Sequence, residues 1–250
     1  MRLFGLIGYP LSHSFSKKYF TEKFEQEDLA DCRYELFPIA SINEIKNVLA
    51  QNPDLCGLNV TIPYKEQVIP FLDETDEVVK KIKACNCIYI NRGRLKGYNT
   101  DVKGFEQSLK KQLRPHNRKA LILGTGGSAK AVEFVLQKLG IDFKYVSRKP
   151  AHNNYSYEQL TAGILTDHTL IVNTTPLGMY PAVTEAPPIP YEALTPDHYL
   201  FDLVYNPEKT LFLQKGEERG AVIKNGYEML VIQAEESWRI WNDATMDNKQ

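Results

Sequence analysis

The stretch LILGTGGSA at residues 121–129 decides the fold of this chain. Its apolar start is typical of a buried strand, and G-x-G-x-x-A follows before a segment of helical period. In such a strand, turn and helix, Gly124 permits the tight turn, Gly126 lets backbone N–H groups approach a pyrophosphate, and Ala129 allows close helix packing. The pattern favours dinucleotide binding, with a plain tight turn as the alternative.

The next apolar run along the chain ends at Ser147, Arg148 and Lys149. An NAD-binding protein usually carries an acidic residue there, for the ribose 2′-hydroxyl. This chain has two cations instead, which suit a 2′-phosphate, and the guanidinium of Arg148 can also stack on adenine. The sequence therefore predicts NADP, and the alternative is that both cations merely end a strand in solvent.

Strands and helices alternate on both sides of this block. We expect strands at 4–8, 34–39, 56–60, 119–123, 143–146, 169–172 and 199–204, helices at 17–28, 42–49, 100–113, 128–139 and 227–241, a hairpin of 87–90 with 95–98, and a loop at 181–196. Pro63 can open a further helix capped by Thr61, with Lys65 in its first turn. The alternation predicts parallel sheets with helices on both faces, in two α/β units.

Composition excludes several classes of protein. The chain has 250 residues, 43% of them hydrophobic and 24% charged, as is usual for globular proteins that bury a core. A net charge of -1 without long runs of like charge argues against nucleic acid or an anionic membrane as a partner. No window is long and apolar enough for a membrane span or a signal sequence, so we expect a cytoplasmic protein.

Cysteine and histidine give no sign of a metal site. The four cysteines include one C-x-C and no second pair, which fits neither a disulfide framework nor zinc-ligand spacing. The five histidines are scattered along the chain. We therefore expect buried or incidental thiols and no metal.

Seven further blocks lie in order along nearly the whole chain. They are PLSHS (10–14), NVTIPYK (59–65), ACN (84–86), GYNTD (97–101), NTTPLGM (173–179), DLVYNP (202–207) and GYEMLVIQA (226–234). Together with the glycine-rich block, they resemble the motifs of the shikimate dehydrogenase family. The resemblance implies an α/β protein with an N-terminal substrate domain, a Rossmann-like NADP-binding domain, and a C-terminal helix that returns to the first. It implies two domains, a substrate domain formed by residues 1–101 together with 226–250, and an NADP-binding domain formed by residues 102–225.

The activity that the resemblance implies is reversible NADPH-dependent reduction of 3-dehydroshikimate to shikimate, a step toward chorismate and the aromatic amino acids. Hydride transfer to a ketone leaves negative charge on its oxygen, so a proton donor must lie within reach. Lys65 matches the family's general acid/base and Asp101 its essential acid. Partial burial would help Lys65 to release its proton, and the Asp101 carboxylate would oppose this release. Without the resemblance, both residues fit ordinary helix positions.

Shikimate carries one carboxylate and three hydroxyls, so its site needs short polar groups. The resemblance implies that Ser12 and Ser14 bind the carboxylate at a helix N-terminus, with helix capping as the alternative for either serine. The residues it implies for the substrate are Ser12, Ser14, Thr61, Lys65, Asn86, Asp101, Tyr205 and Gln233. A site of this kind rejects analogues that lack a hydroxyl, because its own polar atoms would stay unpaired.

For the cofactor, the resemblance adds residues around the nicotinamide and the edge of the second sheet. The full set is Glu77, Gly124, Thr125, Gly126, Gly127, Ser128, Ala129, Ser147, Arg148, Lys149, Asn173, Thr174, Thr175, Leu203, Gly226 and Met229. Among these, Met229 could instead be a residue of the hydrophobic core. Gly226 is expected because a residue without a side chain lets the backbone come close to the nicotinamide.

Two other functions stay open from the sequence. One is a quinate/shikimate dehydrogenase of the same superfamily, which accepts an extra ring hydroxyl and often NAD. The other is a cofactor-binding regulatory protein that has lost turnover, against which Lys65 and Asp101 argue. The expected partner is a small-molecule substrate, and the chain is expected to be a monomer or a homodimer.

Overall fold

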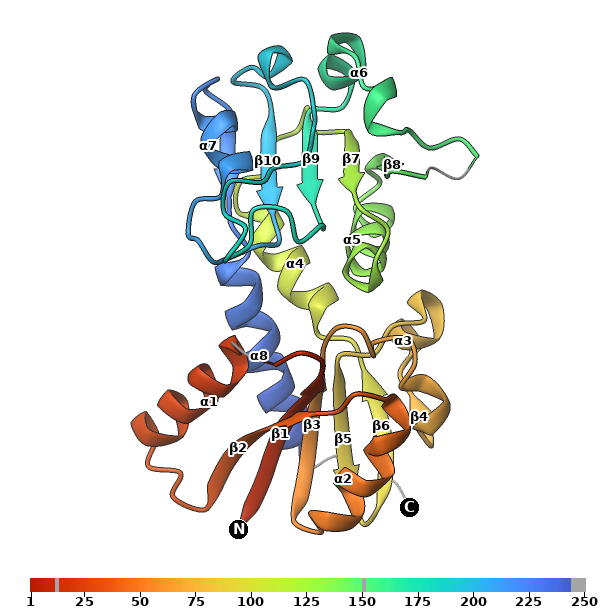
Figure 1. Cartoon of the computed structure of the whole chain (residues 1–250), viewed down its shortest axis with the longest axis vertical. Helices are drawn as coiled ribbons and strands as arrows, with labels where there is room; N and C mark the ends of the chain where they lie inside the picture. Colours follow the sequence, from red (N-terminus) through yellow and green to blue (C-terminus); the bar gives the residue numbers. More distant parts are fainter. Residues whose placement is uncertain (12–13, 150–151, 244–250) are drawn as a thin grey trace. The chain divides into compact units, whose positions relative to one another are not determined.

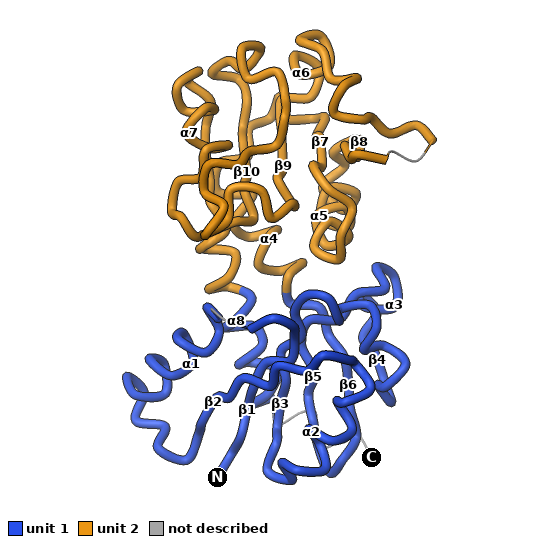
Figure 2. The backbone as a smooth tube through the Cα atoms, in the orientation of Figure 1, with its two compact units in different colours: residues 1–100, 233–250 blue, residues 101–232 orange. Residues whose placement is uncertain are grey.

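The computed structural model describes residues 1–11, 14–149 and 152–243. The chain forms two compact units, which Figure 2 distinguishes by colour. Unit 1 comprises residues 1–100 and 233–250, and unit 2 comprises residues 101–232. The first unit is therefore built from both ends of the chain. The domain limits implied by the resemblance, which cut the chain after 101 and after 225, stay a prediction. Ser12 lies outside the described residues.

Unit 1 is built on a six-stranded sheet in the order β2-β1-β3-β5-β6-β4 (Figure 1). Its strands are β1 (Arg2–Gly8), β2 (Cys32–Pro38), β3 (Leu55–Val60), β4 (Glu74–Thr75), β5 (Cys87–Asn91) and β6 (Arg94–Tyr98). The pairs of β1 with β2 and with β3 are parallel, as expected, whereas β5 runs antiparallel to both β3 and β6. The prediction of parallel pairing is thus wrong for β3 with β5. The predicted hairpin of 87–90 with 95–98 is confirmed, and Arg92 and Gly93, both with positive φ, close its two-residue turn.

Helices cover both faces of this sheet. They are α1 (Phe15–Gln26), the short α2 (Ile45–Gln51), α3 (Glu77–Ile82), and the end of α8 (Tyr227–Trp241). Ile45 and Val48 of α2 pack on one face, and Phe20 of α1 packs with Phe4 and Trp241 on the other. The Trp241 indole donates to a β5 carbonyl, which fixes the end of α8 to unit 1.

The helix predicted to begin at Pro63 does not form. Residues 62–68 make successive turns, which pass at Ile69–Phe71 into a single 3₁₀ turn. The N–H of Tyr64 bonds to the Thr61 carbonyl and that of Ile69 to Glu66, both over three residues. The Val68 N–H bonds to the Tyr64 carbonyl over four residues, so three- and four-residue bonds alternate, and Pro70, which has no N–H, ends the segment before a regular helix is established.

Unit 2 holds a parallel sheet of five strands in the order β11-β10-β9-β7-β8. The strands are β7 (Lys119–Leu123), β8 (Asp142–Val146), β9 (Leu170–Asn173), β10 (Tyr199–Asp202) and β11 (Val222–Lys224). The chain passes from β7 to β8 on one side and then returns to place β9 on the other. This reversal is the topological switch point of a doubly wound fold, where ligands bind at the carboxyl ends of the strands.

Helices lie on both faces of the second sheet, as predicted. They are α4 (Asp101–Lys110), α5 (Gly127–Lys138), α6 (Ala162–Asp167) and α7 (Leu211–Glu217). Phe105 of α4 meets Phe201 at a ring distance of 5.0 Å, whereas the neighbouring Leu200 packs with Phe212 of α7 on the opposite face. Each unit has hydrophobic clusters of its own.

Candidate active site

One edge of the unit 1 sheet gathers predicted substrate residues. Thr61 directly follows β3, and Asn86 directly precedes β5, which runs the opposite way. The carbonyl of Asn86 accepts the Val60 N–H at 2.9 Å, and the Asn86 N–H donates to the Tyr98 carbonyl at 3.1 Å. Residues distant in the sequence therefore meet where parallel strands end and the antiparallel strand begins.

Lys65 lies in the turn that follows β3 and is half-buried. Its backbone carbonyl accepts the Cys85 N–H at 2.7 Å. This bond joins the turn to the residue before Asn86. Lys65 therefore belongs to the same sheet edge, although it is not in the helix that the sequence predicted.

Ser14 is the N-cap of α1. Its hydroxyl oxygen accepts the Lys17 N–H at 3.2 Å. Capping uses a lone pair and leaves the hydroxyl hydrogen to donate, so the same serine can bind a carboxylate. The structure thus bears out the capping alternative without removing the substrate role.

Asn86 and Gln233 lie together with a residue that the sequence did not single out. The Asn86 Nδ2 donates to the Thr100 hydroxyl oxygen at 2.9 Å and to the Gln233 Oε1 at 3.4 Å. The Thr100 N–H donates to the Asn86 Oδ1 at 2.7 Å. Thr100, which follows β6, is 1% exposed. The two amides come together because α8 returns to unit 1.

Three more polar side chains extend this cluster into the core. Asn59 donates to the Ser237 hydroxyl oxygen at 3.0 Å, and its Oδ1 accepts the Tyr34 phenol at 2.8 Å. Burial raises the pKa of Tyr34. Two features of the sequence could have pointed to this cluster. Asn59 is a polar residue within an apolar strand, and Ser237 lies one turn after Gln233 on α8. Neither feature shows which distant residue the side chain would bond.

In unit 2, the glycine-rich turn lies at the switch point. Gly124 has a φ of 99°, and a Cβ there would lie 2.9 Å from both the Thr174 Oγ1 and the Thr175 Cγ2. The Thr174 hydroxyl donates to the Leu123 carbonyl at 2.6 Å. The end of β9 therefore touches the turn after β7, which brings two predicted cofactor segments together.

The N-terminus of α5 presents backbone rather than side chains. Its N-cap is Gly126, and among the described residues no side chain caps it. A Cβ on Gly126 would meet no described atom within 4 Å, so the space beside it is open. Thr125 is exposed, Gly127 and Ser128 are half-buried, and Ala129 packs with 1% exposure. A helix N-terminus that presents backbone N–H groups, with open space beside its N-cap glycine, fits a phosphate group.

The predicted 2′-phosphate residues follow β8, the strand beside β7. Ser147 is half-buried and its N–H bonds to the Tyr155 carbonyl, whereas Arg148 and Lys149 are exposed. The Arg148 charge partly offsets the effect of burial, which raises the pKa of Tyr157. Both cations thus lie free of the core at the carboxyl end of their strand.

Buried hydrogen bonds join the ends of β9 and β10. Asn173 donates to the Asp202 Oδ1 at 2.9 Å, and the Thr210 hydroxyl donates to the Asp202 Oδ2 at 2.5 Å. Burial outweighs these bonds and raises the pKa of Asp202 to about 6. Because Asn173 also accepts the Thr175 N–H and hydroxyl, this pair fixes the loop that reaches the glycine-rich turn.

Two of the residues predicted to line the nicotinamide, Leu203 just after β10 and Gly226 just after β11, lie side by side. A Cβ on Gly226 would lie 2.2 Å from the Leu203 carbonyl oxygen, so the glycine permits close approach of its own chain. Met229 is 4% exposed, in agreement with core packing. Tyr205 is half-buried, and burial raises its pKa.

Asp101 and Glu77 occupy the starts of helices. Asp101 is the first residue of α4 and is 5% exposed. Glu77 is exposed in the first turn of α3 and bonds to Lys80 at 2.7 Å. Asp101 belongs to unit 2, whereas Lys65 and Glu77 belong to unit 1.

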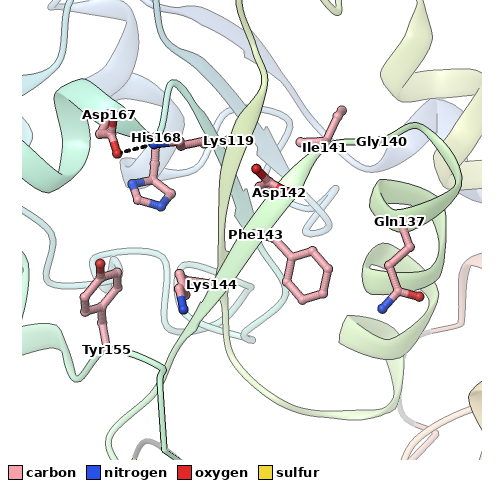
Figure 3. A pocket seen from close by; sticks show the side chains of 10 residues that line it. All are labelled: Lys119, Gln137, Gly140, Ile141, Asp142, Phe143, Lys144, Tyr155, Asp167 and His168. Atoms are coloured by element: carbon pink, nitrogen blue, oxygen red, sulfur yellow. Dashed lines mark hydrogen bonds and ion pairs between the residues drawn. The ribbon is translucent and has the colours of Figure 1, made fainter.

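A shallow pocket of about 700 Å³ lies along β8 in unit 2 (Figure 3). It is lined by Lys119, Gln137, Gly140, Ile141, Asp142, Phe143, Lys144, Tyr155, Asp167 and His168. Lys119 and Asp142 begin their strands, so the pocket lies toward the amino ends, away from the glycine-rich turn. It contains none of the predicted site residues.

Neither a metal centre nor a membrane span is found within residues 1–11, 14–149 and 152–243. No group of three or more histidine, cysteine, aspartate or glutamate side chains could hold a metal ion there. No helix of that part combines the length and the apolar character that a membrane crossing requires. Its four cysteines are free thiols.

Fold and site together define a class, the α/β oxidoreductases with a doubly wound nucleotide-binding unit. Residues 6–88 match the model of the shikimate dehydrogenase substrate binding domain. A shikimate dehydrogenase (NADP(+)) of Clostridium beijerinckii is 38% identical, over 100% of this chain and 95% of its own.

Two solved structures are similar over nearly their whole length. The shikimate 5-dehydrogenase of Thermus thermophilus, in complex with NADP(H) and shikimate, is 28% identical, with a TM-score of 0.85 and 97% and 94% of the two chains covered. That of Listeria monocytogenes, in complex with shikimate and NAD, is 27% identical, with a TM-score of 0.83 and 96% and 91% covered. The chain belongs to the shikimate dehydrogenase family.

Proposed function

We propose that this protein catalyses the reversible NADPH-dependent reduction of 3-dehydroshikimate to shikimate, in the biosynthesis of chorismate and the aromatic amino acids. The observation that carries the proposal is the similarity to an NADP(+)-dependent shikimate dehydrogenase over the entire chain. The N-terminus of α5, where no described side chain makes a cap bond and the space beside Gly126 is open, supports it, because it suits a dinucleotide phosphate.

For the substrate, the proposal uses the carboxyl edge of unit 1. Ser14 and Ser12 bind the carboxylate, and Thr61, Asn86 and Gln233 hydrogen-bond the ring hydroxyls. From unit 2, Asp101 and Tyr205 complete the polar set. Since short neutral groups predominate, an analogue that lacks a hydroxyl leaves one of them unpaired and binds poorly. We propose that residues 1–101 with 226–250 form the substrate domain.

NADPH, when bound, supplies the hydride for the carbonyl carbon. In the proposed step Lys65 gives a proton from its Nζ to the carbonyl oxygen, and in the reverse direction it takes the proton from the hydroxyl. Asp101 orients the lysine and the neighbouring substrate hydroxyl. The half-buried position of Lys65 keeps its side chain partly away from water.

For the cofactor, Gly124 to Ala129 hold the pyrophosphate, and Ser147, Arg148 and Lys149 hold the 2′-phosphate. Both cations are exposed and so can turn toward an incoming anion. Asn173, Thr174 and Thr175 border the dinucleotide, and Leu203, Gly226 and Met229 line the nicotinamide. Glu77 is the one proposed cofactor residue in unit 1.

Initial rates at 340 nm test the function directly. Shikimate and quinate are crossed with NADP+ and NAD+, for the wild type, Lys65→Ala and the control Lys18→Ala. Lys18 suits this purpose because its side chain is 79% exposed on α1 of the same unit. We expect rapid turnover with shikimate and NADP+, a fall in kcat of about 100-fold or more in Lys65→Ala, and no change in the control.

Other outcomes would identify the alternatives. Comparable rates with quinate, or with NAD+, would favour a quinate/shikimate dehydrogenase of broader specificity. NAD is the dinucleotide bound in the Listeria structure. Absence of turnover with every pair would favour a cofactor-binding regulatory protein. A cytoplasmic location and a monomeric or dimeric state remain predictions from the sequence.

A further inference from the structure

Four buried polar side chains at the edge of unit 1 fix one another's direction. Asn86, Thr100, Gln233 and Ser237 are 3%, 1%, 6% and 0% exposed. At this depth a donor that faces another donor is strongly unfavourable, so hydrogen bonding decides which end of each amide points where.

The Thr100 backbone sets the direction of the Asn86 amide. Its N–H lies 2.7 Å from the Asn86 Oδ1, and a backbone N–H can only donate. The oxygen of Asn86 must therefore face Thr100. The Asn86 Nδ2 in turn donates to the Thr100 hydroxyl at 2.9 Å and faces Gln233.

Asn86 and Thr100 then determine the direction of Gln233. The Gln233 Oε1 lies 3.4 Å from the Asn86 Nδ2 and 3.3 Å from the Thr100 Oγ1, which both act as donors toward it. A reversed Gln233 would bring two NH2 groups together. Its Nε2 therefore lies at the opposite end of the amide, away from Thr100.

Ser237 holds Thr100 and α8 together. Its hydroxyl donates to the Gln233 carbonyl at 2.9 Å, so its oxygen is left to accept the Asn59 Nδ2 at 3.0 Å. The same oxygen lies 3.3 Å from the Thr100 Oγ1. Because the Thr100 hydroxyl has one hydrogen and donates it to Gln233, its contact with Ser237 is one of packing. The hydroxyl is held by the bond it accepts from Asn86 and the bond it donates to Gln233.

We propose that Thr100 is a positioning residue that fixes the Gln233 amide, directly and through Asn86, so that Gln233 meets the substrate as an N–H donor. This rests on the proposed function, in which Gln233 contacts a ring hydroxyl of shikimate. The donor end of Gln233 recognises an oxygen that accepts, and Thr100 acts on recognition without contacting the substrate.

A double-mutant cycle tests the role of Thr100. Thr100→Val removes the hydroxyl with little change of shape, and we expect a rise of about tenfold in KM for shikimate, with kcat and KM for NADP+ nearly unchanged. Thr100→Ser should restore the wild-type KM. In a Gln233→Ala background, Thr100→Val should add clearly less than tenfold, because the part of its effect that passes through Gln233 is gone and only the part through Asn86 remains.

Ser108→Ala is the matched control for this cycle. Ser108 is 0% exposed and bonds to Glu228 in unit 2, whereas the cluster belongs to unit 1, so the variant also loses a hydroxyl bond, but one outside the cluster. It should leave KM for shikimate unchanged. An unchanged KM in Thr100→Val, a full tenfold effect in the Gln233→Ala background, or no restoration by Thr100→Ser would overturn the proposal.

Gln233→Glu tests the direction of the amide without touching Thr100. The carboxylate keeps an oxygen toward Thr100 but replaces the N–H donor with a second acceptor. We expect KM for shikimate at pH 8 to rise about 100-fold and to fall as the pH is lowered, since a protonated carboxyl can donate again.

A near-normal KM for Gln233→Glu at pH 8 would mean that Gln233 accepts from the substrate, which contradicts the proposal. A wild type that turns over no shikimate would instead refute the proposed function. The two failures are therefore distinct, because the first requires an active wild type.

Discussion

At the scale of single residues, Asp202 shows how burial and hydrogen bonding oppose each other. It is 0% exposed and accepts bonds from Asn173, Val204 and Thr210. Burial nevertheless raises the pKa of its carboxyl from 3.8 to about 6. The folded protein therefore binds the proton more tightly than the unfolded chain does, and stability falls as the pH rises from about 4 to about 6.

Asp202→Asn should remove this dependence. The amide can keep the bonds to Asn173 and Val204 through its oxygen and donate to Thr210 through its nitrogen. Relative to the wild type, the variant should gain roughly 3 kcal/mol in free energy of unfolding between pH 4 and pH 7. Urea unfolding at each pH measures this difference. A difference that stays constant with pH would contradict the raised pKa.

Single residues of the site differ in how far the sequence could predict them. Gly124 and Ala129 are local requirements of a strand, a turn and a helix, and the structure gives them the positive φ and the close packing expected. The direction of the Gln233 amide depends on Thr100, which lies 133 residues away in the chain. No local pattern records such a contact.

At the scale of elements, a charged cluster fastens the start of α8 to its neighbours. Glu228 bonds to Lys111 just after α4, to Lys224 of β11 at 2.6 Å, and to Ser108. Burial would raise the pKa of Glu228, but these hydrogen bonds outweigh it and lower the pKa to about 2. The resulting stability is complete above pH 4.5 and is lost as the pH falls toward 2.

Glu228→Gln should lower the free energy of unfolding by about 1–2 kcal/mol at pH 7, because it leaves two lysines without their shared carboxylate. The loss should shrink as the pH is lowered toward 2. Glu22→Gln is the control, since its ion pair with Lys18 is 3.8 Å long and exposed. Equal effects of the two variants in urea unfolding at pH 7 would show that the cluster adds nothing.

Helices with a clear apolar period were predictable, including the short α2, whereas three other short helices were not. The helix expected at 227–241 has those bounds in the structure. The helices α3, α6 and α7 are six or seven residues long, without a clear period, and the sequence analysis did not identify them. The helix predicted at Pro63 does not form, because bonds over three and four residues alternate in this segment and Pro70 ends it.

At the scale of the whole molecule, the division into two units predicts separate responses to ligands. Both tryptophans, Trp238 and Trp241, lie in unit 1, whereas the glycine-rich turn lies in unit 2. NADP+ at about 100 times its Kd should stabilise the unit that binds it by roughly 2.7 kcal/mol. Urea unfolding followed by circular dichroism, which reports both units, should therefore shift more than unfolding followed by tryptophan fluorescence. An equal shift of both signals would indicate one cooperative unit instead.

The sequence by itself determined the two α/β units, the nucleotide turn and the family, because these depend on local periodicity and on motifs of fixed spacing. Only the tertiary structure decided that β5 runs antiparallel to β3, that the Lys65 segment is a turn, and that Thr100 joins Asn86 to Gln233. Such outcomes depend on contacts between distant residues and on hydrogen bonds whose direction is fixed only after burial, when water can no longer substitute for a missing partner.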